Sequence, residues 1–286
     1  MTPELEAEYR NGLESALKAG WAILERGGSS LDAVEAAVVS LEDCPLFNAG
    51  RGSVFTHEGK IEMDAAIMDG HALKAGAIAF VRNVKNPVKL ARLVMERSEH
   101  VLLAGEGADM FAEEVGVELA DNTYFYTDFR WKQLEEAIAA GRVQLDHVAS
   151  KPIGTVGAVS CDKNGNLAAA TSTGGMTNKR FGRVGDTAII GAGTYADDVC
   201  AVSCTGHGEY FMLGVTANDL AARMKYKGLN LEDASRETID RLTSIGGEGG
   251  LIAVDTQGNL VLPFNSEGMY RGYALEGQQP HVKIYR

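Results

Sequence analysis

Cysteine and basic residues are both scarce in this sequence of 286 residues. The four cysteines, at positions 44, 161, 200 and 204, form no Cys-x-x-Cys pair, and the histidines are not spaced to complete a zinc site with them. This argues against the common zinc motifs and predicts reduced, mostly buried thiols. Lysine and arginine total 27 against 39 acidic residues, which gives a net charge of −12 without a basic cluster. We therefore expect neither nucleic acid nor an anionic membrane surface as a partner.

Long apolar runs are missing as well, so no segment is expected to cross a bilayer. The first residues, Met-Thr-Pro-Glu-Leu-Glu, are acidic and lack the basic and apolar regions of a signal peptide. We therefore expect a cytoplasmic protein. The hydrophobic fraction of 45% and the charged fraction of 23% are typical of a soluble globular chain with an ample core.

Helical and strand patterns occur in separate blocks along the chain. Helices are expected at 2–26, 29–44, 86–94, 107–115, 130–140, 209–226 and 231–245. Strands are expected at 60–68, 75–81, 101–103, 155–161, 167–172, 251–254 and 260–264. The polar, poorly patterned residues 141–152 read as a linker that ends just before Gly154. Segregated blocks favour an α+β fold, a four-layer sandwich, over a doubly wound parallel sheet.

The candidate catalytic residues lie in four stretches rich in threonine and glycine, and the first of these stretches contains Gly154-Thr155. If the bond before Thr155 breaks, that residue gains a free α-amine beside its hydroxyl. Such an amine has a pKa of about 7.7–8.0 and can act as the base for the hydroxyl at neutral pH. The glycine before it leaves room for the hydroxyl to attack its own preceding carbonyl. The pattern therefore indicates amide hydrolysis by an amino-terminal threonine.

The other three stretches supply suitable partners. Thr205 and the N–H of Gly206 can donate to an oxyanion, and one such donor typically lowers a barrier by about 3 kcal/mol. Thr173 can hydrogen-bond the nucleophile. Arg183 and Asp186 suit the carboxylate and the ammonium of an amino-acid substrate. Taken singly, each has an ordinary structural explanation, as a strand threonine, a turn or a solvated ion pair.

Taken together, these stretches resemble the plant-type L-asparaginase/isoaspartyl peptidase family of amino-terminal-nucleophile hydrolases. The resemblance covers most of the chain and includes residues 41–50, 63–70, 73–77, 86–96, 154–159, 170–179, 182–186, 205–209 and 265–272. It implies a four-layer αββα sandwich that cleaves itself at Gly154–Thr155. Residues 1–154 would then form an α subunit and residues 155–286 a β subunit, assembled as an (αβ)₂ dimer of heterodimers. The implied substrates are β-aspartyl dipeptides and L-asparagine.

The resemblance also implies a role for each matching residue. Thr155 would be the nucleophile, assisted by Thr173, with Thr205 and Gly206 as the oxyanion hole. Residues that would hold the substrate are Arg183, Asp186, Gly208 and Asn48. No cofactor is implied for catalysis, but the 41–51 loop resembles one that binds a structural sodium ion. Its backbone carbonyl ligands would be those of Leu41, Glu42, Cys44, Phe47, Ala49 and Arg51.

Three other functions are also compatible with parts of the sequence. Family members begin with a strand and a His-Gly-Gly-Ala-Gly motif, whereas this sequence starts at the first helix. An unprocessed, inactive relative that acts as a binding or scaffold protein is therefore an alternative. A glycosylasparaginase-like hydrolase is another, although Gly154 stands where those enzymes are expected to carry aspartate. A nucleotide-binding loop at Thr173-Gly174-Gly175 lacks the flanking pattern of a phosphate-binding loop.

Overall fold

The chain begins with a pair of helices, α1 (Pro3–Glu25) and α2 (Ser30–Glu42), which pack against each other. The computed structural model describes residues 1–143 and 154–285. Thr2 and Ser29 cap the two helices, since their hydroxyls accept hydrogen bonds from Leu5 N (3.3 Å) and Asp32 N (3.1 Å). The predicted helical hairpin is confirmed.

A five-stranded sheet follows, with the strand order β3-β2-β1-β5-β4. Its strands are β1 (Met63–Asp69), β2 (Lys74–Val81), β3 (Leu102–Ala104), β4 (Val156–Cys161) and β5 (Leu167–Thr173). Only the β2–β3 pair is parallel among the pairs of this sheet. The antiparallel register aligns Val156 with Ser172 and Asp64 with Thr173. The start of β4 and the end of β5 therefore meet at one end of the sheet.

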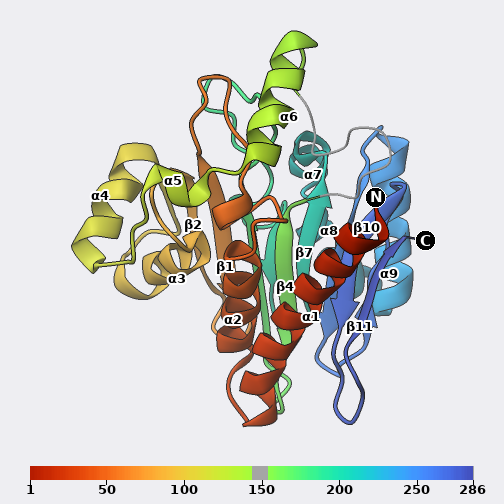
Figure 1. Cartoon of the computed structure of the whole chain (residues 1–286). Helices are drawn as coiled ribbons and strands as arrows, with labels where there is room; N and C mark the ends of the chain where they lie inside the picture. The colour runs from red at the N-terminus through yellow and green to blue at the C-terminus, as the bar shows by residue number, and fades with distance from the viewer. Residues whose placement is uncertain (144–153, 286) are drawn as a thin grey trace.

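Two further sheets come from the second half of the chain. The four-stranded one has the order β6-β7-β8-β9 and contains β6 (Thr194–Ala196), β7 (Cys200–Gly206), β8 (Gly249–Asp255) and β9 (Leu260–Val261). The other is a hairpin of β10 (Gly268–Tyr273) and β11 (His281–Tyr285), which packs beside α1 (Figure 1). Strands β4 and β5 lie against β7 and β8, so the two larger sheets contact each other.

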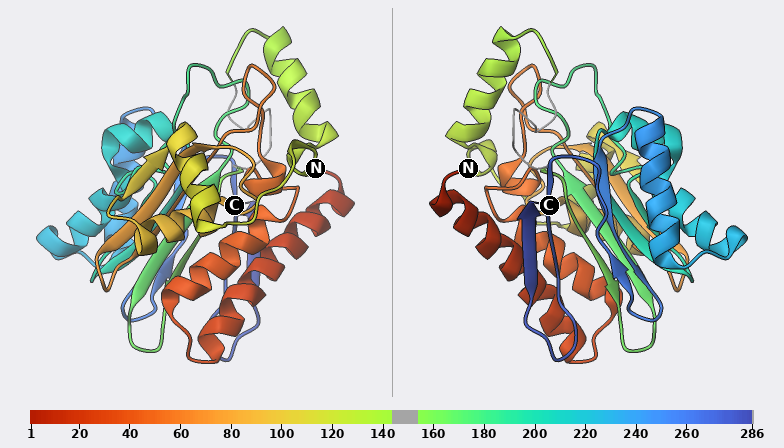
Figure 2. Two further views of the ribbon diagram at one scale, coloured as in Figure 1. Left: turned by 90° about the vertical axis from the view of Figure 1, so that its left-hand side faces the viewer. Right: turned by 90° about the vertical axis from the view of Figure 1, so that its right-hand side faces the viewer.

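The helices cover the sheets from different sides. Helices α2, α3 (Pro87–Arg97) and α4 (Gly105–Val115) contact the five-stranded sheet, and α7 (Gly208–Gly214), α8 (Thr216–Lys227) and α9 (Leu231–Ser244) contact the four-stranded one. Figure 2 shows the α1–α2 pair and the α8–α9 pair on opposite sides of the strands. The remaining elements are η1 (Gly50–Gly52), α5 (Asn122–Phe125) and α6 (Asp128–Ala139). The predicted α+β class is confirmed.

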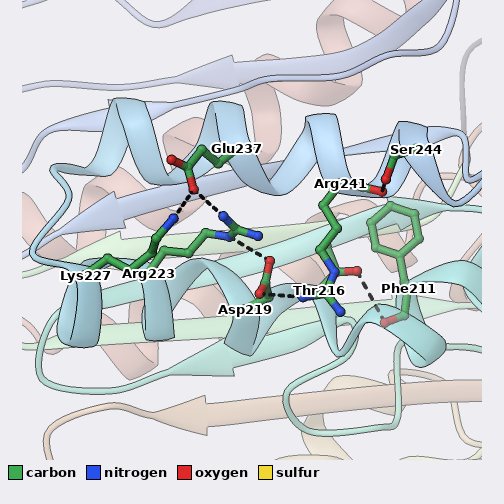
Figure 3. Close-up of polar contacts among 8 residues, drawn as sticks. All are labelled: Phe211, Thr216, Asp219, Arg223, Lys227, Glu237, Arg241 and Ser244. Carbon is green, nitrogen blue, oxygen red and sulfur yellow. Dashed lines mark hydrogen bonds and ion pairs between the residues drawn. The ribbon is translucent and has the colours of Figure 1, made fainter.

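Helices α8 and α9 are joined by a network of ion pairs (Figure 3). Arg223 of α8 binds both Asp219 and Glu237, and Arg241 of α9 donates to the second oxygen of Asp219 at 3.1 Å. Lys227 completes the network with a 2.7 Å bond to Glu237. The network pairs opposite charges between the two helices, with Arg223 and Asp219 largely covered.

Several local predictions need correction. The helix expected at 209–226 is broken at Val215, whose φ of 48° is left-handed and ends α7. The strand expected at 260–264 ends at Val261, and the hairpin β10–β11 was not predicted. Most of the expected linker at 141–152 lies outside the described residues. Among the helices of the described ranges, none is long and apolar enough to cross a membrane.

Candidate active site

Thr155 lies immediately before β4, where the strand register brings it to the last residue of β5, Thr173. Their hydroxyl oxygens are 3.1 Å apart. The Thr173 oxygen also accepts a 3.0 Å hydrogen bond from the N–H of Gly175, which leaves its own hydrogen available for Thr155. A hydroxyl held by a second hydroxyl in this way has a fixed direction, which is what a nucleophile requires.

The carbonyl of Gly154, on the other side of the same peptide bond, is also held. It accepts a 2.9 Å hydrogen bond from the backbone N–H of Asn48. The Asn48 side chain is buried, accepts from Val54 N at 3.0 Å and donates to Gly175 O at 2.7 Å. Asn48 therefore joins the loop after α2 to the segment after β5 and to the Gly154–Thr155 bond.

Arg183 and Asp186 lie in the loop between β5 and β6, on either side of Gly208. A Cβ atom on Gly208 would come within 2.6 Å of Asp186 Oδ1 and 2.9 Å of Arg183 Nη2. A larger residue at position 208 would push the ends of these two side chains aside. Arg183 does not bind Asp186 but forms a bidentate pair with Glu209, with both N···O distances at 2.9 Å.

Asp186 is buried, and burial raises the pKa of its carboxyl to about 7. Its Oδ2 atom has no hydrogen-bond partner among the described residues. A buried acceptor that its own protein leaves unsatisfied is costly, and such groups concentrate at functional sites. This carboxyl can therefore accept a hydrogen bond from an ammonium group of a ligand.

Two more buried charges, which sequence reasoning did not single out, lie next to Arg183. Burial raises the pKa of Asp64 on β1, and burial lowers the pKa of Lys179. Asp64 accepts a 3.0 Å bond from Phe80 N, while Lys179 donates to Glu62 O at 2.7 Å. Asp64 is remote in sequence from Arg183. Lys179 is near Arg183 in sequence but stands in an ordinary loop pattern, so no local signal identifies either group.

Thr205 and Gly206 are the last two residues of β7. Gly206 has φ of 150°, and a Cβ atom there would lie 2.4 Å from Glu248 O, so glycine is required. The Thr205 hydroxyl is buried and has no hydrogen-bond partner within 1–143 and 154–285. No described hydrogen bond joins it to Thr155 or Thr173. The hydroxyl is free to donate to a ligand.

The 41–51 loop runs from the end of α2 to η1. Three of its six expected carbonyl ligands accept backbone N–H groups at 3.2–3.4 Å, namely those of Leu41, Cys44 and Ala49. The Leu41 oxygen also accepts the N–H of Asp43, whereas the Cys44 and Ala49 oxygens each keep a second lone pair, and oxygen is the ligand that hard cations prefer. In the described part of the chain, no group of three or more His, Cys, Asp or Glu side chains could hold a metal ion. A cation in this loop would therefore rest on backbone oxygens.

The sequence matches the protein-family model described as Asparaginase over residues 1–284. The chain belongs to the asparaginase family. It is 53% identical to the isoaspartyl peptidase of Salmonella typhimurium over all of its own length and 94% of the relative's. The isoaspartyl peptidase of Escherichia coli is 50% identical, with 100% and 91% of the two chains covered. A probable isoaspartyl peptidase/L-asparaginase 2 of Arabidopsis thaliana is 43% identical, with 99% and 94% covered.

The predicted resemblance and the prediction of a hydrolase are thereby confirmed for this asparaginase-family chain. The described contacts bring Thr155, Thr173, Asn48 and Gly154 together, and separately Arg183, Asp186 and Gly208. Glu209 is the residue that sequence reasoning missed at this second group. It belongs to the Thr-Gly-His-Gly-Glu stretch, but 26 positions separate it from Arg183, and their pairing depends on the fold.

Proposed function

We propose that this asparaginase-family protein cleaves itself between Gly154 and Thr155 and then hydrolyses β-aspartyl dipeptides and L-asparagine. The main support is the geometry at this peptide bond. The Thr155 hydroxyl is 3.1 Å from that of Thr173, and the Gly154 carbonyl accepts the N–H of Asn48. The names of the relatives supply the substrate class.

Self-cleavage begins when the Thr155 hydroxyl attacks the carbonyl carbon of Gly154. The C–N bond breaks, the amine of Thr155 takes up the proton, and an ester remains between Gly154 and the threonine oxygen. Water hydrolyses that ester and releases a carboxylate on Gly154. The Asn48 N–H stabilises the negative charge that develops on the Gly154 oxygen.

Turnover uses the new α-amine of Thr155 as the base for its own hydroxyl. The oxygen attacks the side-chain carbonyl of the substrate, ammonia or an amino acid leaves, and water releases aspartate. The Thr205 hydroxyl and the Gly206 N–H would donate to the oxyanion, in keeping with the buried, unused hydroxyl of Thr205. Arg183 would bind the α-carboxylate, and Asp186, beside Gly208, the α-ammonium.

We also propose a subunit division, a sodium site, an assembly and a cellular location for this protein. Residues 1–154 and 155–286 would form α and β subunits of one αββα domain, supported by the contacts between the two larger sheets. A sodium ion would be held by carbonyls of the 41–51 loop, and two αβ units would associate as (αβ)₂. Four free cysteines suit the reducing cytoplasm. Native mass spectrometry of the incubated protein tests the assembly.

Denaturing mass spectrometry and an aspartate-release assay with β-aspartyl-leucine test the function. We expect fragments of 154 and 132 residues together with released aspartate. Thr155→Ala should abolish both, whereas Thr256→Ala, on an exposed turn, should change neither. A single intact mass and no aspartate would overturn the proposal and favour the unprocessed binding protein. Hydrolysis by the Thr155→Ala variant would show that another residue is the nucleophile.

A further inference from the structure

Glu209 occupies one edge of the Arg183 guanidinium. Its two carboxylate oxygens accept from Nε and Nη2 at 2.9 Å each, in the planar two-point geometry that fixes the plane of a guanidinium. Although burial alone raises its pKa, the hydrogen bonds from Arg183 lower the pKa of Glu209 below the ordinary value. The pair therefore remains ionised at neutral pH.

The opposite end of the guanidinium faces glycine. Nη1 of Arg183 makes no hydrogen bond within the described residues. A Cβ atom would approach Nη1 to 3.6 Å at Gly175 and to 2.8 Å at Gly185, and Nη2 to 2.9 Å at Gly208. The end of the fork is thus bordered by three residues without side chains, which lets the guanidinium lie close to their backbones.

A second cation, Lys179, lies beside one of these glycines, Gly175. Nζ of Lys179 would lie 3.1 Å from a Cβ atom on Gly175, and Lys179 is almost fully buried. Gly175 also donates its N–H to Thr173, which contacts Thr155. Gly175 therefore lies between the two cations on one side and the Thr155–Thr173 pair on the other.

We propose that Glu209 is a positioning residue, which holds Arg183 so that its Nη1 end faces these glycines and selects ligands with an α-carboxylate. This inference rests on the proposed function, and it adds a residue that acts through Arg183 rather than on the substrate. Without Glu209, the guanidinium can rotate about its long side chain, and the entropy of fixing it must be supplied by the ligand.

Calorimetric titration separates this role from a merely structural one. The probes are L-aspartate and its α-amide, which lacks the negative charge that Arg183 would bind. In Glu209→Gln we expect L-aspartate to bind about tenfold more weakly, equivalent to about 1.4 kcal/mol, while binding of the α-amide stays unchanged. Glu209→Asp, which keeps the charge on a shorter chain, should recover part of the loss.

Glu237→Gln is the matched control, because Glu237 also pairs with an arginine and lies in the α8–α9 network of Figure 3. It should bind both probes as the unmodified protein does. For β-aspartyl-leucine, Glu209→Gln should raise KM about tenfold and leave kcat and the extent of cleavage into two fragments unchanged.

Three outcomes would overturn the inference: equal weakening for both probes, no weakening of L-aspartate, or no binding of L-aspartate to the unmodified protein. Tighter binding of L-aspartate would show that Glu209 competes with the ligand. A different result would contradict the proposed function without contradicting the positioning role. If L-aspartate binds selectively through Glu209 but no hydrolysis occurs, the site is a binding site and the positioning role stands.

Discussion

Arg223 on α8 and Arg183 beside Gly208 both bind carboxylates, but their surroundings differ. In the α8–α9 network both oxygens of Asp219 have cationic partners, and Lys227 and Arg241 are about half exposed. Around Arg183, the carboxyls of Asp64 and Asp186 are buried, and each has one oxygen without a partner among the described residues. The first cluster joins two helices at little cost. The second carries a desolvation cost that its own partners offset only in part, and a ligand could offset more of it.

Removal of Arg183 should have the largest effect. Loss of one partner of a buried, hydrogen-bonded charge pair costs roughly 2–5 kcal/mol, so we expect Arg183→Ala to lower kcat/KM for β-aspartyl-leucine about 100-fold or more. Self-cleavage should persist, because the bond at Gly154 has no free α-carboxylate. Steady-state kinetics and fragment masses measure the two effects. Equal loss of both would indicate misfolding instead.

Asp186→Asn should separate activity from stability. The amide cannot pair with the substrate ammonium, and we expect kcat/KM to fall roughly 10- to 100-fold. Thermal unfolding should occur at the same or a higher temperature, because the buried carboxylate no longer has to be desolvated. Asp219→Asn is the matched comparison, for which stability should fall and turnover should not. A lower melting temperature for Asp186→Asn would contradict the assignment of a desolvation cost to this carboxylate.

The pH dependence follows from the same carboxyl. Its folded-state pKa of about 7 exceeds the ordinary value of 3.8, so the folded protein retains a proton that the unfolded chain has lost. The free energy of unfolding should therefore decline as pH rises from about 4 to about 7. Urea unfolding at pH 5 and pH 8 measures this decline. It should be smaller in Asp186→Asn but still present, because burial also raises the pKa of Glu42 to about 8.

The smallest effect is expected in the α8–α9 network. Glu237→Gln removes an exposed carboxylate that pairs with Arg223 and Lys227. Such pairs contribute under about 1 kcal/mol, and salt screens them. The loss of unfolding free energy should shrink further at 1 M salt. A larger loss of unfolding free energy that salt does not reduce would show that these ion pairs behave like buried ones, as those around Arg183 do.

Local patterns predicted the first helical hairpin and most strands, because capping residues and apolar spacing act over a few positions. They also indicated Thr155 and Thr173, because each occurs in a glycine-rich stretch beside a strand. The Glu209–Arg183 pair could not be predicted, since it depends on how the start of α7 meets the loop after β5. At the break before α8, the left-handed residue is the β-branched Val215 rather than the neighbouring Gly214, so the local pattern still reads as one helix.

The hydrogen bond from Asn48 to Gly154 has a consequence for what happens after cleavage. The oxygen it binds would become part of the carboxylate at the new end of the first fragment. That carboxylate would stay tethered beside Thr155 at a high effective concentration, and it would compete with any incoming substrate. The Gly154 carboxylate would then occupy the site in place of substrate. Its departure from Asn48, rather than bond breakage itself, would set the moment when the enzyme becomes active.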